Sequence, residues 1–325
     1  MGTTDIDLKP EEFALAASEA VSDAQKRSFR DAAEVLANAG LSGVCASEEA
    51  GGLGLGIEFA RPIVAETGKL GLQWPLLETL LIARALGDSP LASELCSGAR
   101  IATWALQGSL QEGFAGQARH AEKSDWVLVA HGAEAGSGAA LLDLATVEIQ
   151  HDDALDPENP QSWLVLDKAK AKVLAELDAA TFAALKREGH ILVASLVNGA
   201  AENALNTTAT YLSARVQFGR PLSAKQAVRH LLARMRLLQE AANAGIERVL
   251  EADESGCARQ VGSVLANALS SAAFVLEKSI HLHGGMGFTW EVPLHRALRE
   301  VRKFDAAFGS GGLAQQVGQD FIQSV

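Results

Sequence analysis

The sequence predicts a mainly helical protein that contains one small β region. Alanine and leucine are abundant, whereas the chain has one tyrosine and eight prolines, a composition that favours helices over sheets. Apolar residues recur at helical spacing in the first hundred residues and again from residue 178, and short β-prone runs lie between these two stretches. A chain of 325 residues can form two or three units, since a domain holds roughly 100–200 residues. We therefore expect three regions, over residues 1–100, 101–177 and 178–325.

The first region, residues 1–100, is predicted to be an N-terminal helical domain. Apolar residues recur every three or four positions over 13–20 and 29–36, with Gly40 as a helix stop. Two further helices are expected over 59–67 and 76–86. The glycine-rich segment that precedes them, 47–56, contains a G-x-G spacing but follows no predicted strand, so it does not fit a dinucleotide-binding fingerprint and is expected to be a turn.

The second region, residues 101–177, is predicted to be a small β domain. Its β-prone runs are separated by Gly, Asp, Asn and Pro. They cover residues 126–130, 139–143, 147–149 and 163–166. This pattern indicates an antiparallel arrangement of about five or six strands. We expect the loop over 152–160 to lie on its surface.

The third region, residues 178–325, is predicted to be a helical bundle. A long helix is expected over 182–218, where Gly219-Arg-Pro221 would stop it, and Ser223 and Gln226 match the capping-box pattern for the next helix. Further helices are predicted over 258–282 and 292–304, followed by a final helix after the glycines at 309–312. Long antiparallel helices with short connections are typical of a bundle.

Charge and hydropathy exclude several classes of partner. The formal net charge is 28 − 40 = −12, which is unfavourable for nucleic acid because its phosphates require a basic face. The longest apolar stretch, residues 191–201, is far shorter than the ~20 residues that cross a bilayer. The polar segment Met1–Pro10 lacks the apolar run of a signal peptide. We expect no membrane partner.

The three cysteines, Cys45, Cys96 and Cys257, are odd in number and far apart. They form no C-x-x-C pair, so a disulfide framework or a zinc site is not expected, and a reducing cytoplasm is the predicted location. His281 and His283 have no carboxylate three or four residues away, which disfavours a metal site there. No G-x-S-x-G motif or readable Cys/His pair indicates hydrolase chemistry.

Two motifs in the third region suit a phosphate-containing ligand. Residues 281–288 contain adjacent glycines, whose backbone can approach a ligand closely and bind phosphate through exposed N–H groups. In residues 215–222, Arg215 and Arg220 flank a chain break, and the helix that starts at Gln226 adds a positive dipole end. The alternatives are a simple stop between two helices and two solvated arginines beside a proline.

Taken together and in this order, the motifs resemble those of the acyl-CoA dehydrogenase family. Residues 41–55 resemble the family's early turn, GLLGLAVPEEYGGLGL. Residues 215–221 resemble R-x-x-F-G-R/K-P, Gln226 falls where the family places the Gln of an F-Q pair, and residues 281–291 resemble Q-x-x-G-G-x-G-F-T-x-E. The resemblance covers nearly the whole chain, and it implies an N-terminal helical domain, a middle β domain and a C-terminal four-helix bundle.

The resemblance also implies a cofactor and a reaction. Members of the family bind FAD and oxidise an acyl-CoA thioester to the 2,3-enoyl thioester, while a carboxylate removes the α-proton and an electron-transfer flavoprotein takes the electrons. In the family's dimers, residues at the matching positions clamp the ADP half of the neighbouring subunit's FAD. The positions carried over here are Arg215, Phe218, Gln226, Gly284 and Gly285.

This sequence departs from the family pattern at the catalytic base. Gly309 stands where the family often has the Glu of Y-E-G-T, and glycine cannot abstract a proton. Some members carry the base on the first bundle helix, where Gly189 is expected to stand, so Glu188 and Glu202 are the remaining weak candidates. The T-E-P-x-A-G-S-D loop and the hairpin motif that contacts the flavin ring are also missing, which implies a shortened middle domain.

A chain that keeps the donated clamp and lacks the equipment around the ring resembles the short subunit of heterotetrameric (α2β2) acyl-CoA dehydrogenases of bacterial steroid side-chain catabolism. The expected partner is a catalytic paralogue, and the expected substrate is a bulky acyl-CoA such as a steroid side-chain thioester. Two alternatives remain open. One is a self-sufficient homomeric dehydrogenase with Glu188 or Glu202 as base, and the other is a non-catalytic scaffold without FAD.

Overall fold

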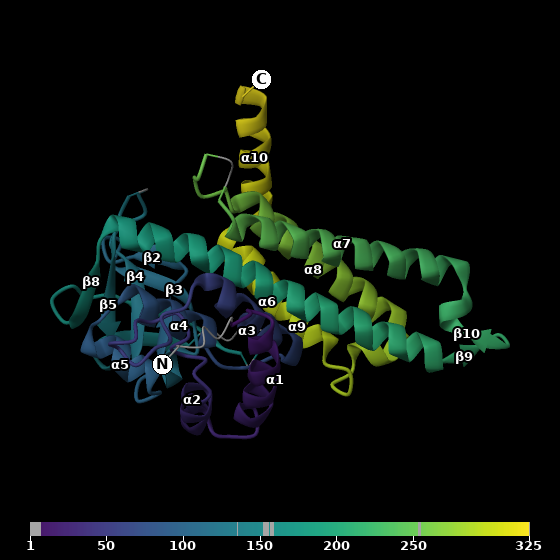
Figure 1. Cartoon of the computed structure of the whole chain (residues 1–325), viewed down its shortest axis with the longest axis horizontal. Coiled ribbons are helices and arrows are strands. Elements are labelled where there is room, and N and C mark those ends of the chain that lie inside the picture. Colours follow the sequence, from purple (N-terminus) through teal and green to yellow (C-terminus); the bar gives the residue numbers. More distant parts are fainter. Residues whose placement is uncertain (1–7, 135, 152–155, 157–158, 253–254, 325) are drawn as a thin grey trace, which may run out of the picture.

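The computed structural model describes residues 8–134, 136–151, 156, 159–252 and 255–324. Its N-terminal region is a group of five helices (Figure 1). Ser28 begins the second of them by accepting a hydrogen bond from the N–H of Asp31. Gly40, in the left-handed region at φ +73°, follows the end of that helix, as predicted. The helices are α1 (Glu12–Ala24), α2 (Phe29–Asn38), α3 (Ile57–Leu70), α4 (Leu76–Ala85) and α5 (Pro90–Cys96).

The middle region consists of two four-stranded sheets packed face to face. The first has the order β1 (Ala102–Trp104), β4 (Trp126–Ala130), β5 (Ala139–Asp143), β8 (Val173–Leu177). The second has the order β2 (Gln107–Ser109), β3 (Phe114–Arg119), β7 (Gln161–Val165), β6 (Glu148–His151). Alternate residues of β4 serve two cores: Val127 and Val129 face the second sheet, whereas Trp126 and Leu128 face the helices. The first sheet is therefore buried on both faces.

The prediction for this region was incomplete. The described residues between 102 and 177 form eight strands rather than five or six, and β1 pairs with β4 in parallel, so the region is not wholly antiparallel. The loop predicted over 152–160 falls mostly outside the described residues. Of its described members, Asp156 and Asn159 are buried against the bundle rather than exposed.

The C-terminal region is a bundle of long helices, and α6 runs its full length from the sheets to the far end (Figure 1). Asp178 caps α6 by accepting a hydrogen bond from the N–H of Thr181 at 2.7 Å. The helices are α6 (Ala179–Ala214), α7 (Gln226–Leu250), α8 (Gly262–His283), α9 (Leu294–Phe308) and α10 (Ser310–Ser324). None of the helices in the described residues combines the length and apolar character needed to cross a membrane.

The end of α6 differs from the prediction. The helix stops at Ala214, and the next residues form a hairpin of β9 (Val216–Gln217) and β10 (Arg220–Pro221). The predicted capping box is also wrong: Ser223 lies in a 3-10 turn, and no side chain caps α7 at Lys225. The helix ends before the predicted position because Phe218 and Gly219 have positive φ, which is incompatible with a right-handed helix. These two residues form the turn of the hairpin instead.

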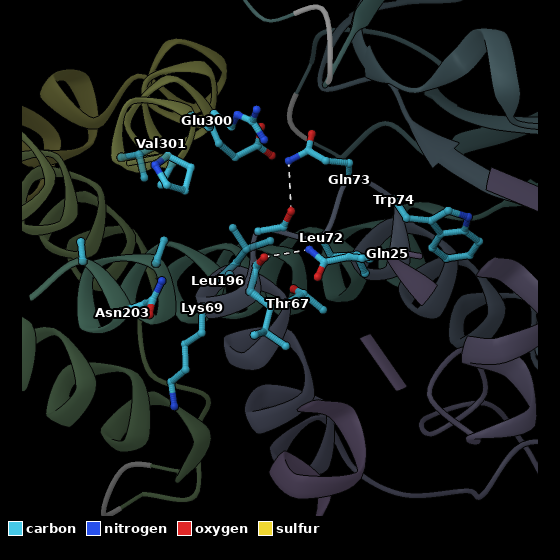
Figure 2. A pocket seen from close by; sticks show the side chains of 18 of the residues that line it. Gln25, Thr67, Lys69, Leu72, Gln73, Trp74, Leu196, Asn203, Glu300 and Val301 are labelled. Atoms are coloured by element: carbon cyan, nitrogen blue, oxygen red, sulfur yellow. Dashed lines mark hydrogen bonds between the residues drawn. The ribbon is translucent and has the colours of Figure 1, made fainter. Parts of the chain in front are cut away.

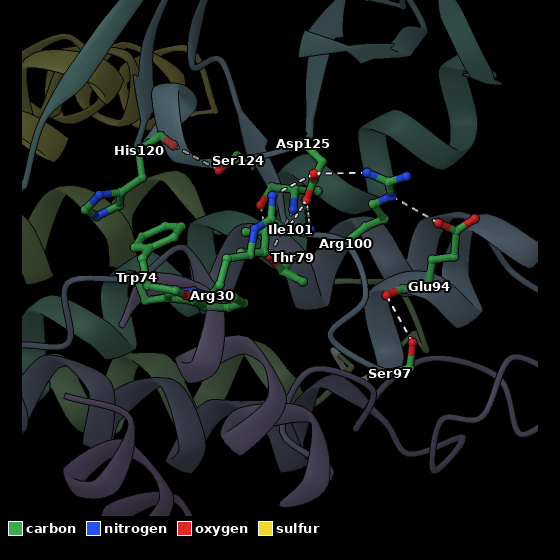
Figure 3. A network of polar contacts seen from close by, with 12 residues as sticks. Arg30, Trp74, Thr79, Glu94, Ser97, Arg100, Ile101, His120, Ser124 and Asp125 are labelled. Atoms are coloured by element: carbon green, nitrogen blue, oxygen red, sulfur yellow. Dashed lines mark hydrogen bonds and ion pairs between the residues drawn. The ribbon is translucent and has the colours of Figure 1, made fainter. Parts of the chain in front are cut away.

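Two kinds of contact hold the regions together. The helices α3 and α6 cross backbone to backbone: a Cβ added at Gly68 would lie 1.9 Å from the carbonyl oxygen of Leu196, and one added at Gly199 would lie 2.1 Å from that of Ala65. At the other junction, Asp125, which precedes β4, accepts two hydrogen bonds of 2.7 Å from Arg30 of α2 (Figure 3). These contacts fix the N-terminal helices against both the bundle and the sheets.

Candidate functional site

The hairpin after α6 presents an aromatic ring to solvent on a strained turn. Phe218 and Gly219 are its two central residues, and both have positive φ, +55° and +76°. This is the type I′ pattern, which strongly prefers Asn or Gly at both positions. A phenylalanine in the left-handed region is an outlier for a bulky residue. Its side chain is nevertheless 88 % exposed, with only Lys225 Nζ above the ring at 4.8 Å. Strain together with exposure marks Phe218 as a functional candidate.

The arginines on either side of this turn are available to a ligand. Arg215 is the C-cap of α6, its N–H donates to the carbonyl of Tyr211, and its carbonyl accepts from the N–H of Leu222. Both Arg215 and Arg220 are exposed. Neither guanidinium forms a hydrogen bond or an ion pair with any residue that the structure describes. Gln226 is the exposed first residue of α7, where free backbone N–H groups and the helix dipole favour an anion.

The glycine motif forms a second turn, at the end of α8. Gly284 has φ +61°, and residues Gly284–Phe288 form a 3-10 turn. A Cβ added at Gly284 or Gly285 would meet nothing within 4 Å, so the backbone there is open to an incoming group. Gly287 has a different role: a Cβ there would lie 2.3 Å from the carbonyl oxygen of Ile280, so its lack of a side chain is required by packing.

The two predicted motifs lie at the same end of the bundle (Figure 1). Tyr211, one helical turn before Arg215, stacks on His283, which directly precedes Gly284, with ring centroids 4.5 Å apart. His283 is buried and its Nδ1 is 2.8 Å from the carbonyl oxygen of Ser279, which holds the ring in place. Residues some seventy positions apart in sequence are thereby brought together, and the sequence contained no signal for this contact.

Large apolar side chains are exposed beside both turns. Phe288 is 77 % and Trp290 59 % exposed, and Val216 and Met286 are also exposed. Scattered single apolar residues are normal on a protein surface, but several large exposed apolar residues in and beside two turns, one of which carries two arginines, are typical of an interaction site. We name this group the bundle-end surface, which consists of Arg215, Val216, Phe218, Arg220, Gln226, Gly284, Gly285, Met286, Phe288 and Trp290.

Gly309, which stands where the family often has the catalytic glutamate, lies at the end of a helix. Gly309 is the C-cap of α9 at φ +62°, and its N–H donates to the carbonyl of Asp305 at 2.8 Å. This left-handed conformation favours glycine, so the absence of a carboxylate at this position is built into the backbone. The structure also shows Asp305 in contact with the hydroxyl of Ser310.

The two weak candidates for the base are each held in an ion pair. Both Glu188 oxygens accept from Arg84 Nε, at 3.1 and 3.0 Å, and Arg84 Nη1 also donates to the carbonyls of Cys45 and Leu55 at 3.3 Å. Glu188 thus anchors the glycine-rich turn to α6. Glu202 pairs with Lys69 at 3.3 Å. Neither carboxylate can accept a proton without weakening these contacts.

A buried polar cluster joins the sheets to α9. Arg119, at the end of β3, lies 3.2 Å from Glu78 of α4 and 3.3 Å from Glu300 of α9. Lys303 donates to the carbonyl of Asn159 at 2.7 Å. Burial raises the pKa of Glu78. Burial also acts to raise the pKa of Glu300, but the charges of Arg119 and Lys303 lower it overall. The cluster is a mixed one, in which buried positive and negative groups lie within ion-pair distance of each other.

Aromatic rings continue this cluster toward Gly309. The Arg119 guanidinium lies 5.2 Å from the ring of Phe304, Phe304 stacks on Phe308 at 6.3 Å, and Phe308 meets His190 of α6 edge-on at 5.1 Å. Burial lowers the pKa of His190 to about 4, with a smaller effect from Lys186. Sequence reasoning missed Arg119, Glu300 and His190, because nothing in the local pattern links a strand end to two distant helices.

Comparison with known proteins identifies relatives for most of the chain. Residues 183–317 match the model described as "Acyl-CoA dehydrogenase, C-terminal domain". The chain is 28 % identical to the acyl-CoA dehydrogenase FadE34 of Mycobacterium tuberculosis, over 85 % of this chain and 40 % of FadE34. It is also 28 % identical to the acyl-CoA dehydrogenase IpdE2 of the same organism, over 79 % of this chain and 75 % of IpdE2. The chain therefore spans less than half the length of the first of these relatives.

Solved structures share the fold over the whole chain. The steroid ACAD Tcur3481-Tcur3483, in a variant form, superposes with a TM-score of 0.84 at 23 % identity, over 97 % of this chain and 98 % of that chain. The ChsE4-ChsE5 complex from M. tuberculosis gives 0.80 at 21 % identity, over 99 % and 98 %. A glutaryl-CoA dehydrogenase from Mycobacterium smegmatis in complex with FADH2 gives 0.78 at 16 % identity, over 97 % and 95 %. The predicted fold class, mainly helical with a small β domain, is confirmed.

Proposed function

We propose that the chain, whose residues 183–317 match the acyl-CoA dehydrogenase C-terminal domain and whose fold acyl-CoA dehydrogenases share, is a subunit of a heteromeric, FAD-dependent acyl-CoA dehydrogenase. It contributes the nucleotide-binding half of an FAD site through the bundle-end surface. The binding site for the flavin ring and the catalytic base are supplied by a paralogous partner chain. Relatives described as a steroid ACAD and as a ChsE4-ChsE5 complex support a heteromeric assembly.

The observation that carries this proposal is the contrast between the two ends of α6. At its C-terminal end, Phe218 is held exposed on a strained turn between two arginines without partners among the described residues. Near its N-terminal end, the base position is a left-handed glycine, and rings and ion pairs fill the space between the sheets and α9. A strained aromatic residue is retained at a cost of about 1–2 kcal/mol only where something else compensates.

The residues of the bundle-end surface fit the nucleotide half of FAD. Arg215 and Arg220 can pair with a pyrophosphate, and the first turn of α7 adds backbone donors beside Gln226. The open backbone at Gly284 and Gly285 permits close approach of a phosphate or ribose. Phe218 offers a planar face on which an adenine ring can stack.

The ring half of the site is not built in this chain. Gly309 supplies no carboxylate, and Glu188 and Glu202 are engaged with Arg84 and Lys69. When bound, FAD would accept the hydride that is removed during α,β-desaturation of an acyl-CoA thioester. This chain's own residues hold the nucleotide and orient it across the interface, and the α-proton is removed by a carboxylate of the partner. The substrate class is a bulky acyl-CoA, in keeping with the steroid ACAD among the related structures. The electron acceptor is an electron-transfer flavoprotein.

Co-expression with a longer paralogue encoded nearby tests the proposal. The chain purified alone should be colourless and inactive, and the complex should contain about one flavin per two chains and oxidise acyl-CoA. Arg215→Ala should lower the flavin content of the complex about tenfold without dissociating it, because a charge-assisted contact is worth roughly 1.5–3 kcal/mol. Arg236→Ala is the matched control, because Arg236 pairs with Glu240 on the outer face of α7.

Two outcomes contradict the proposal. A yellow, active preparation of this chain alone would indicate a self-sufficient homomer. Loss of its activity in Glu188→Gln or Glu202→Gln would then identify the base. Absence of flavin from every complex would indicate a scaffold.

A further inference from the structure

A large cavity lies between the N-terminal helices and the bundle, and none of the residues of the bundle-end surface lines it. It has a volume of about 560 Å³ and is bounded by α1, α2, the end of α3, the middle of α6 and the start of α9. Figure 2 shows Leu196 and Asn203 of α6 on one side, Glu300 and Val301 of α9 on another, and Trp74 at the right of the view, near Gln25 and Gln73. Its volume falls within the roughly 300–1,000 Å³ of pockets that bind small molecules.

Most of the cavity wall is apolar and rigid. Phe29 and Trp74 are fixed against each other, because the Trp74 indole N–H donates to the Phe29 carbonyl at 3.0 Å. Leu72, Leu196, Ala200 and Val301 complete the apolar wall. The close crossing of α3 and α6 at Gly68 keeps this wall from collapsing inward, since the two backbones are already in contact there. An apolar body is therefore the occupant that this part of the cavity favours.

One part of the wall carries polar groups with unused hydrogen-bonding capacity. The Arg119 side chain is 4 % exposed and lies within ion-pair distance of Glu78 and Glu300, yet its Nε and Nη1 form no hydrogen bond with the described residues. The buried Oε1 of Gln73 likewise has no partner within the described part of the chain, although Gln73 Nε2 donates to the Gly71 carbonyl at 3.2 Å. Buried polar atoms left in this state point to a missing partner, because nearly all such atoms are satisfied in native proteins.

The charges around the cavity decide the charge of the occupant. Three of the four cationic groups of the wall have a carboxylate within ion-pair distance: Asp23 for Arg27 at 3.2 Å, Glu66 and Glu202 for Lys69 at 2.7 and 3.3 Å, and Glu78 and Glu300 for Arg119. The fourth, Arg296, lies 5.1 Å from the uncharged ring of Trp290. A charged ligand would need to disrupt one of these pairs and would leave its own charge uncompensated in a largely apolar space.

We propose that this cavity is a second binding site, for an uncharged molecule with an apolar body and one carbonyl or hydroxyl group. The apolar body lies against Trp74, Leu196 and Ala200. A carbonyl or hydroxyl oxygen accepts from Arg119, and a hydroxyl can also donate to Gln73 Oε1. This site is separate from the proposed FAD clamp and does not depend on it.

Fluorescence titration of the purified full chain with 6-propionyl-2-(dimethylamino)naphthalene, an uncharged aromatic ketone, tests the site. We expect saturable binding with a blue shift. Ala200→Phe and Ala297→Phe place a ring in the cavity from α6 and α9, and each should weaken binding at least about tenfold. Ala184→Phe is the matched control, because Ala184 is an exposed residue of α6 outside the cavity. Gln73→Leu should leave the affinity for this ketone unchanged, because the ketone has no N–H or O–H to donate to Gln73 Oε1.

A negatively charged analogue of the probe tests independently whether the site prefers an uncharged ligand. The corresponding naphthalene sulfonate, which has a similar body and a negative charge, should not compete for the site. Absence of saturable binding to the wild type overturns the proposal. So does binding that is unchanged in both cavity-filling variants, or equal affinity for the sulfonate. Circular dichroism of each variant shows which of them fold, and either cavity-filling variant alone suffices for the comparison.

Discussion

Tyr211 stacks on His283 with ring planes 17° from parallel, and this contact joins the end of α6 to the end of α8. Tyr211 is the one tyrosine in the sequence. The stack lies directly behind the bundle-end surface, because Arg215 follows Tyr211 by one helical turn and Gly284 follows His283. The relative position of the arginine turn and the glycine turn therefore depends on a pair of rings that contribute no group to the surface itself.

Replacement of Tyr211 by leucine should lower both the stability of the chain and the flavin content of the complex. Tyr211→Leu removes an aromatic pair worth about 0.5–1.5 kcal/mol, so the free energy of unfolding should fall by that amount. The flavin content of the complex with the paralogue should fall as well, because the two turns lose their common support. Urea unfolding and flavin absorbance measure the two effects. Tyr211→Phe keeps the ring and is the control; equal flavin content in the Leu and Phe variants would contradict this role.

Phe218→Gly should stabilise the free chain and impair the complex. Glycine removes the left-handed strain, which is worth roughly 1 kcal/mol, and little burial is lost because the ring is exposed. The midpoint of thermal unfolding should therefore rise in the isolated chain. Flavin retention by the complex should fall, since the stacking face is lost. A variant with lower stability, or with undiminished flavin, would show that the ring serves packing rather than binding.

Gly309→Glu should not create a dehydrogenase. The new side chain would sit in the left-handed region, and the free energy of unfolding should fall by about 1–2 kcal/mol. Gly311→Glu is a matched control, because Gly311 lies in α10 with open space around it and helical glycines cost about 1 kcal/mol relative to good helix formers. The free energy of unfolding should thus fall in Gly309→Glu and rise in Gly311→Glu. Acyl-CoA oxidation by the free chain should stay absent in both variants. Activity in Gly309→Glu would refute the argument from backbone conformation.

His120 should make stability depend on pH. Burial, together with the charges of Arg119, Lys303 and Lys123, lowers the pKa of His120 to about 2. An unfolded histidine titrates near pH 6.5, so the unfolded chain binds the proton first and stability is lost as the pH falls below about 6.5. The slope from this group approaches about 1.4 kcal/mol per pH unit. His120→Gln should reduce the slope of unfolding free energy between pH 6 and 4.5 by that amount. An unchanged slope would mean that His120 is protonated in the folded chain.

Local sequence patterns predicted those strands whose residues have high β propensity. The strands at 126–130 and 139–143 agree with β4 and β5, because β-branched and aliphatic residues are continuous there. The strand β3, Phe114–Arg119, was missed because alanine and glycine dominate it, and its pairing with β2 and β7 is what makes it a strand. The end of α6 was misplaced because Phe218 occupies a conformation that its residue type disfavours.

The clamp residues could be identified from motif order, but their surroundings could not. Arg215 and Gly284 were predicted as parts of one site from the resemblance, whereas the Tyr211–His283 stack that brings them together is a long-range contact. The same holds for Arg119, whose partners come from α4 and α9. Such contacts depend on how helices cross, and helical periodicity specifies only which face of each helix is buried.

The crossing of α3 and α6 has a consequence for how this chain can vary. At Gly68 and Gly199 even a methyl group would overlap a carbonyl oxygen of the other helix, so any side chain at either position must drive the two helices apart. Saturation mutagenesis scored by protein abundance should therefore reject every replacement at these two positions. At Gly285, by contrast, where φ is not positive and the space is open, larger residues should accumulate normally and fail only a screen for flavin. Glycines at two places in one polypeptide would then be invariant for unrelated reasons, architecture in the first case and chemistry in the second.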